Sequence, residues 1–66
     1  MLKYIGDFDK DLTKYGFVRA NDYEIAYIKR MDNVNAFIDL GRCCVSFRNN
    51  AFDDLIKDGL VIKEAE

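Results

Sequence analysis

Three segments in the middle of this 66-residue chain have the hydrophobic and polar patterns of strands. Residues 23–30 are rich in β-branched and aromatic side chains, which favour a pleated, half-buried conformation. Residues 34–40 alternate between apolar and polar at both ends of the segment, and residues 43–47 continue that pattern. The pattern therefore predicts three consecutive strands.

Two short turn sequences separate these segments and set their register. Asp32 and Asn33 tolerate the positive φ angles of a two-residue type I′ hairpin turn, and Gly41 fits the first central position of a type II′ turn. We therefore predict a three-stranded antiparallel meander. The predicted pairs are Ile28 with Phe37, Tyr27 with Ile38, Ala26 with Asp39, Leu40 with Cys43, Asp39 with Cys44, Ile38 with Val45, and Phe37 with Ser46.

This register divides the meander into two faces of different character, because successive side chains on a strand point to opposite sides. The predicted apolar face carries Tyr23, Ile25, Tyr27, Ala36, Ile38, Leu40, Cys43, Val45 and Phe47. The opposite face, called the mixed face below, carries Ala26, Ile28, Arg30, Asn35, Phe37, Asp39, Cys44, Ser46 and Arg48. We expect the apolar face to form the core.

The segment before the meander predicts a short helix. Phe8, Leu12 and Tyr15 have the i, i+4, i+7 spacing of one helical stripe, and Gly16 suits the residue just after a helix. We predict a helix at about 8–15. Residues 1–5 fit either the entry to this helix or a short edge strand.

The segment after the meander predicts a second helix. Asn49 or Asn50 can cap its start, and Gly59 can end it in a Schellman motif with Leu60. Residues 60–63 are candidates for a further edge strand. The whole chain, residues 1–66, is then a single small α+β domain with an N-terminal and a C-terminal helix on one face of the sheet.

Composition supports a folded but small domain. Half of the residues are apolar and none is proline. A chain of this size buries only about 60% of the surface that its unfolded form exposes, so the monomer is expected to be marginally stable and to gain from self-association. The net charge of −2 argues against a duplex-DNA binder, because phosphate contacts need a basic surface.

No apolar run approaches the length of a membrane span, and no basic segment followed by an apolar one suggests a signal peptide. The two cysteines do not form a disulfide framework of the kind that secreted domains use. The cytoplasm is therefore the expected compartment, and no membrane contact is expected.

The candidate chemistry of the chain is sparse. Cys43 and Cys44 are adjacent, so a strand would place them on opposite faces, and without histidine or a second cysteine pair they do not suggest a zinc site. Cys43 fits a small core residue. Cys44 fits a small residue at a packed interface, or a reactive thiol if an arginine reached it. No nucleophile-and-histidine arrangement is possible, so we expect no enzyme activity, cofactor or small-molecule substrate.

The mixed face carries the candidate functional site. Ile28 and Phe37 form an apolar centre flanked by Ala26 and Cys44, and the polar residues around them are Arg30, Asn35, Asp39, Ser46 and Arg48. An apolar centre with a polar rim is typical of a protein interface. Two alternatives remain open: residues 1–7 or the last strand could cover this face, or Phe37 could stack single-stranded nucleic acid with Arg30 and Arg48 on its backbone.

Four stretches of the chain, "LTKYGF", "YEIAYIK", "VNAFIDL" and "LIKDGLVIKE", give it a further resemblance. Together they resemble the short uncharacterised proteins common in phages and mobile elements of low-GC Gram-positive bacteria. The resemblance implies a small accessory or inhibitor protein and assigns no site residue. We therefore predict a non-enzymatic protein-interaction module, a homodimer or the binder of another protein, with single-stranded nucleic acid as the alternative ligand.

Overall fold

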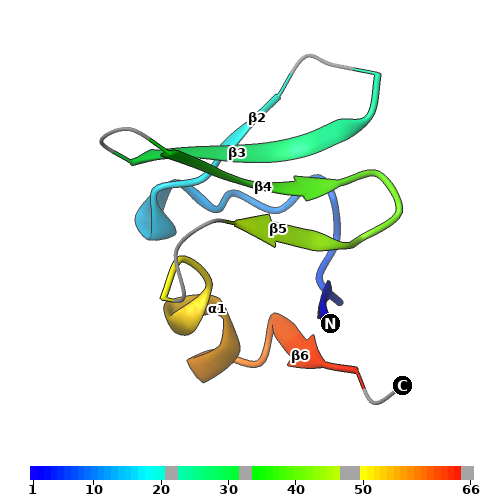
Figure 1. Cartoon of the computed structure of the whole chain (residues 1–66), viewed down its shortest axis with the longest axis vertical. Coiled ribbons are helices and arrows are strands. Elements are labelled where there is room, and N and C mark those ends of the chain that lie inside the picture. Colours follow the sequence, from blue (N-terminus) through cyan, green and yellow to red (C-terminus); the bar gives the residue numbers. More distant parts are fainter. Residues whose placement is uncertain (21–22, 32–33, 47–49, 65–66) are drawn as a thin grey trace.

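A computed structural model describes residues 1–20, 23–31, 34–46 and 50–64 of the chain. Two antiparallel sheets dominate it, accompanied by one 3-10 helix and one short α-helix (Figure 1). In chain order the elements are β1 (Leu2–Tyr4), η1 (Thr13–Tyr15), β2 (Val18–Arg19), β3 (Ile25–Met31), β4 (Val34–Asp39), β5 (Cys44–Ser46), α1 (Asp53–Lys57) and β6 (Val61–Lys63).

The larger sheet contains four strands in the order β2-β3-β4-β5, and the smaller one pairs β1 with β6. An isolated bridge between Lys3 and Cys43 brings the two sheets together, and the amide of Tyr4 donates a 2.8 Å hydrogen bond to the carbonyl of Arg42. The strands β1 and β6, from the two ends of the described chain, therefore lie side by side, and β1 lies against the start of β5 (Figure 1).

The predicted α+β arrangement, with a helix at each end of the chain, is wrong. Residues 8–15 contain a turn and only the three-residue η1, and the C-terminal segment contains only the five-residue α1. The Tyr27 hydroxyl contacts the carbonyl oxygens of Phe8 and Lys10, at 2.8 and 2.7 Å. These carbonyls accept from a side chain of β3 and not from the amides of a following helical turn. The predicted helix at residues 8–15 therefore does not form.

The predicted C-terminal end of the second helix is confirmed. Gly59 has a φ angle of 78°, and its amide donates to the carbonyl of Ile56. The amide of Leu60 donates to the carbonyl of Leu55 at 2.8 Å, which completes a Schellman motif. The strand that follows, β6, pairs with β1 and does not extend the meander. Of the two alternatives for residues 1–5, a helix entry or an edge strand, the structure shows a strand.

The first hairpin has the predicted register only as far as a β-bulge. Ile28 pairs with Phe37 and Tyr27 pairs with Ile38, which confirms those two pairs. The pairing shifts between residues 25 and 27, so Ile25 takes the place opposite Asp39 that was predicted for Ala26. The predicted turn at residues 32–33 lies outside the described residues.

The register predicted for the second hairpin is wrong by one residue. The observed pairs are Ile38 with Cys44, Phe37 with Val45, and Ala36 with Ser46. The turn holds three residues rather than two: Asp39 and Cys43 close it, with the Asp39 amide donating to the Cys43 carbonyl at 3.0 Å. Arg42 has a φ angle of 73°, the left-handed conformation that ends such a turn.

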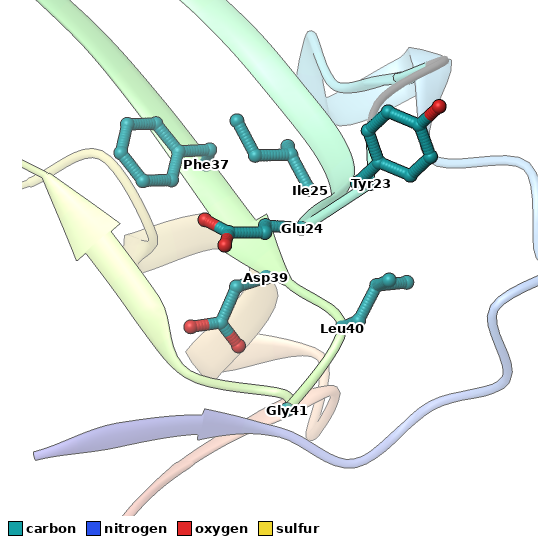
Figure 2. A pocket seen from close by; sticks show the side chains of 7 residues that line it. All are labelled: Tyr23, Glu24, Ile25, Phe37, Asp39, Leu40 and Gly41. Atoms are coloured by element: carbon teal, nitrogen blue, oxygen red, sulfur yellow. The ribbon is translucent and has the colours of Figure 1, made fainter.

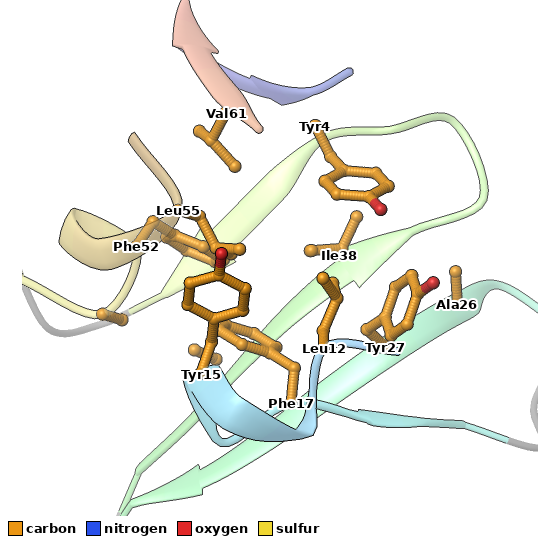
Figure 3. Close-up of a cluster of buried hydrophobic side chains, with 12 residues drawn as sticks. Tyr4, Leu12, Tyr15, Phe17, Ala26, Tyr27, Ile38, Phe52, Leu55 and Val61 are labelled. Atoms are coloured by element: carbon orange, nitrogen blue, oxygen red, sulfur yellow. The ribbon is translucent and has the colours of Figure 1, made fainter. Parts of the chain in front are cut away.

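One face of the larger sheet carries the core. The buried cluster consists of Tyr4, Leu12, Tyr15, Phe17, Ala26, Tyr27, Ala36, Ile38, Ala51, Phe52, Leu55 and Val61. Figure 3 shows side chains from η1, α1, β1 and β6 gathered over Ile38 and Tyr27 of the sheet. Ala26 and Tyr27 are both buried here, since the bulge between Ile25 and Tyr27 breaks the alternation of side chains.

Several residues predicted for the core lie outside it. Tyr23 is 96% exposed, Leu40 is 49% exposed and Val45 is 37% exposed. Ile25 and Cys43 are half-buried, and Phe47 lies outside the described residues. The bulge and the three-residue turn account for Ile25 and Val45, since each irregularity reverses the face on which the following side chains lie.

Among the residues that the structure describes, no helix is long and apolar enough to cross a membrane.

Candidate interaction surface

The face of the larger sheet opposite the core, called the outer face below, carries a row of four apolar side chains. Val18, Ile28, Phe37 and Val45 come from β2, β3, β4 and β5, and each is the direct partner of the next. Directly opposed residues in an antiparallel pair lie on the same side of the sheet. These four residues, called the apolar row below, therefore run straight across the strands.

The apolar row is accessible. Val18 is 51% exposed and Val45 is 37% exposed, while Ile28 and Phe37 are half-buried between them. Within the described part of the chain, none of the four belongs to the buried cluster. Tyr27 and Ile38, in the next row of the sheet, point the other way and are 1% and 0% exposed. The two faces are thus clearly separated.

Charged residues lie at the two sides of the apolar row. Arg30 lies two residues beyond Ile28 on β3 and is exposed, and its pairing partner on β4 is Asn35. On the other side, Asp39 lies two residues beyond Phe37 and pairs with Ile25. The outer face is therefore basic on one side of the row and acidic on the other.

The acidic side contains a pocket of about 500 Å³ (Figure 2). Its lining residues are Tyr23, Glu24, Ile25, Phe37, Asp39, Leu40 and Gly41. In Figure 2 the Phe37 ring and the carboxylates of Glu24 and Asp39 extend to one side, and Tyr23 and Leu40 extend to the other. The pocket thus combines apolar walls with two carboxylates, a suitable environment for a cationic side chain.

The backbone around this pocket is fixed by local hydrogen bonds. Asp39 accepts a 2.9 Å bond from the amide of Cys43 through its Oδ1 atom, and its carbonyl accepts one from Arg42. The amide of Leu40 donates to the carbonyl of Glu24 at 2.9 Å. These bonds hold the end of β4 against the residues that precede β3.

The structure brings together four of the nine predicted interface residues. Ile28, Arg30, Phe37 and Asp39 lie on the outer face. The corrections concern Ala26, Cys44 and Ser46, which lie on the core face; Cys44 packs against the buried cluster, and Ser46 pairs with the buried Ala36. For Asn35 only the backbone pairing is described, and Arg48 lies outside the described residues.

Sequence reasoning missed Val18, Val45 and Ile25 as members of this face. Val18 belongs to a strand of two residues, too short for an alternation to be recognised. In the sequence, Phe17 and Val18 are simply two adjacent apolar residues. The structure shows that Phe17 is buried and Val18 is exposed. Val45 and Ile25 would have been found only by predicting the three-residue turn and the bulge.

The alternative in which the ends of the chain cover the mixed face is wrong. Tyr4 of β1 is fully buried in the core cluster, and Val61 of β6 is 1% exposed in the same cluster. Both strands therefore pack on the core side of the larger sheet. The outer face is on the opposite side.

The two cysteines do not form a disulfide. Burial raises the pKa of the Cys44 thiol to about 12, so this group is a protonated thiol at neutral pH. The Arg42 guanidinium donates a 2.5 Å hydrogen bond to the carbonyl of Gly6 and lies 4.5 Å from the centre of the Phe8 ring. Of the two alternatives for Cys44, a small packed residue therefore fits better than a reactive thiol.

A second hollow of the surface serves the fold. Lys10, Asp11, Lys14, Tyr15, Asp58 and Leu60 line it. The Tyr15 hydroxyl donates to the Asp58 carboxylate, and this bond raises the pKa of Tyr15. Lys14 lies 3.9 Å from the same carboxylate. These groups join η1 to the end of α1 and satisfy one another. Within the described residues, no group of three or more Cys, Asp or Glu side chains is placed to hold a metal ion.

Comparison of the chain with protein-family models, with curated proteins and with solved structures finds no match.

Proposed function

We propose that this protein is a small non-enzymatic interaction module that binds a protein through its outer face. The observation that carries the proposal is the apolar row, an accessible line of four side chains across all four strands of the larger sheet. Exposed apolar patches rimmed by polar residues mark interaction sites in small proteins. Phe37 is the residue expected to contribute most, since aromatic side chains near the centre of an interface commonly dominate its energy.

A protein partner suits the outer face better than single-stranded nucleic acid does. Phe37 has a second aromatic residue, Tyr23, in the same pocket, but Glu24 and Asp39 line that pocket as well. Two carboxylates beside the stacking ring would repel a phosphate backbone. Sites that bind single-stranded nucleic acid instead have a basic groove along the backbone. The accessory or inhibitor role implied by the resemblance to phage and mobile-element proteins belongs to the same proposal.

The size of the outer face supports a transient contact. The four strands contain 2, 7, 6 and 3 residues. At about 3.4 Å per residue and about 4.8 Å between strands, they give roughly 300 Å² for one partner. Two such faces bury on the order of 600 Å², which is less than the roughly 1,200–2,000 Å² of stable complexes. We therefore expect a reversible association of modest affinity.

Affinity capture with a matched pair of variants tests the proposal. Phe37→Asp places a charge in the middle of the apolar row, and Ile62→Asp places the same charge on β6 at a site that is 43% exposed. We expect the wild type and Ile62→Asp to capture the same partner protein, which can be a second copy of this chain. We expect Phe37→Asp to lose this partner while circular dichroism shows an unchanged fold. Retention by Phe37→Asp, or a wild type that retains nothing, contradicts the proposal.

An electrophoretic shift assay with single-stranded and duplex DNA and RNA at low salt separates the two classes of ligand. We expect no shift. A shift that Phe37→Asp abolishes would replace the protein partner by a nucleic acid.

A further inference from the structure

We propose that the partner bound by the outer face is a second copy of this chain, packed face to face about a two-fold axis that runs along the apolar row. The inference rests on the proposed function and names its partner. In this arrangement the two sheets are stacked, and each strand of one copy runs antiparallel to the same strand of the other.

The geometry of the apolar row favours this axis. Its four residues lie on one line perpendicular to the strands, since each is the direct partner of the next. Rotation about that line places Val18, Ile28, Phe37 and Val45 of each copy against the same residues of the other. The apolar row of each copy then covers that of the other. A two-fold interface requires such a match, because both copies use the same surface.

The charges of the outer face select the same axis. Arg30 lies on one side of the row, and Glu24 and Asp39 lie on the other. Rotation about the row exchanges the two sides, so Arg30 of each copy meets the carboxylates of the other. The other face-to-face axis, parallel to the strands, would place the Arg30 side of each copy against the Arg30 side of the other, and the carboxylates against carboxylates. Like charges in contact oppose that arrangement, so complementary charge specifies one orientation.

The pocket provides a place for the arginine. Ile25 and Phe37 form apolar walls that can cover the alkyl part of an arginine, and the exposed Tyr23 ring can lie against its guanidinium. The carboxylates of Glu24 and Asp39 lie in the same pocket. The two-fold axis creates this contact twice in each dimer.

Charge reversal measured by sedimentation provides the test. The protein is studied from about 10 µM to 1 mM, because an interface of roughly 600 Å² predicts a weak dimer. Arg30→Glu places a carboxylate against Glu24 of the other copy, and Glu24→Arg places a guanidinium against Arg30. We expect each single variant to weaken the dimer about tenfold, because two symmetric contacts become repulsive. The double variant is expected to recover most of the affinity.

Lys63→Glu is the control, since it makes the same change of charge at an exposed site on β6, away from the outer face. We expect it to dimerise as the wild type does. Glu24 is chosen for the reversal because it is exposed, whereas Asp39 is half-buried. Circular dichroism on every variant establishes that the fold is retained.

The outcomes separate this inference from the proposed function. A wild type that is monomeric at 1 mM overturns the inference, while Phe37-dependent capture of a different protein would leave the proposed function in place. A dimer that Phe37→Asp does not dissociate overturns the inference, because the self-contact then lies on another surface. A dimer that Phe37→Asp dissociates but the double variant does not restore overturns the two-fold axis along the row.

Discussion

At the residue scale, the Tyr27 side chain decides how the N-terminal segment folds. Its ring lies in the core, 5.7 Å from the ring of Tyr4, and is 1% exposed. Its hydroxyl lies within 3.2 Å of three carbonyl oxygens, those of Asp7, Phe8 and Lys10. One hydroxyl proton serves all three, so this group holds a loop together where the sequence predicts the first turn of a helix.

Removal of this hydroxyl should destabilise the protein without disturbing the core. Tyr27→Phe keeps the ring but removes the donor of the Phe8 and Lys10 carbonyls, while the Asp7 carbonyl still accepts from the Tyr4 hydroxyl. We expect a loss of about 1–2 kcal/mol in the free energy of unfolding. Urea denaturation followed by circular dichroism measures it. Tyr23→Phe is the control, because Tyr23 is 96% exposed and should leave the midpoint unchanged. Equal midpoints for the two variants would show that the hydroxyl has no such role.

At the scale of elements, the hydrophobic pattern predicts strands well where the strand is regular and fails at single-residue irregularities. The pairs on either side of Ile28 and Phe37 follow directly from alternation. The bulge at Ala26 and the left-handed Arg42 each change the register by one residue. Neither has a clear local signal, because alanine is not a typical bulge marker and a left-handed arginine is uncommon.

The same irregularities explain how much of the candidate site the sequence could predict. Ile28, Arg30, Phe37 and Asp39 lie between the bulge and the turn, and all four are on the predicted face. Beyond the turn, Val45 lies on the outer face, where Cys44 had been predicted. The helix predicted at residues 8–15 failed for a different reason: a stripe of three apolar residues fits a helix and also fits a loop that directs the same side chains into the core.

A pair of alanine substitutions tests the observed register of the second hairpin. Ile38 is fully buried, so Ile38→Ala should cost about 2–5 kcal/mol, enough to unfold much of a domain this small. Val45 is 37% exposed on the other face, so Val45→Ala should cost less than about 1 kcal/mol. Thermal melts followed by circular dichroism compare them. Similar large losses for both would support the register predicted from the sequence, in which both residues face the core.

At the scale of the whole molecule, the fold depends on contacts between the two ends of the described chain. Leu2 of β1 pairs with Lys63 of β6, and Tyr4 pairs with Val61. The amide of Ile5 also donates to the carbonyl of Leu60 at 2.8 Å. A chain of this length has a stability of only about 3–10 kcal/mol, so loss of this one strand pair removes a large share of it. Such distant contacts also slow folding, because the long loop between them must close first.

Adjacent residues of β6 provide the sharpest test of this dependence. Val61 is 1% exposed in the core, while Ile62 is 43% exposed and faces away from it. Val61→Asp would bury an unpaired carboxylate among apolar side chains at a cost of about 3–5 kcal/mol, so we expect a largely unfolded protein by circular dichroism. Ile62→Asp places the same charge one residue further along the strand, opposite Lys3, and should retain the fold. If Val61→Asp melts cooperatively near the wild-type temperature, the larger sheet folds without β6, and the contact between the ends of the chain is not required for stability.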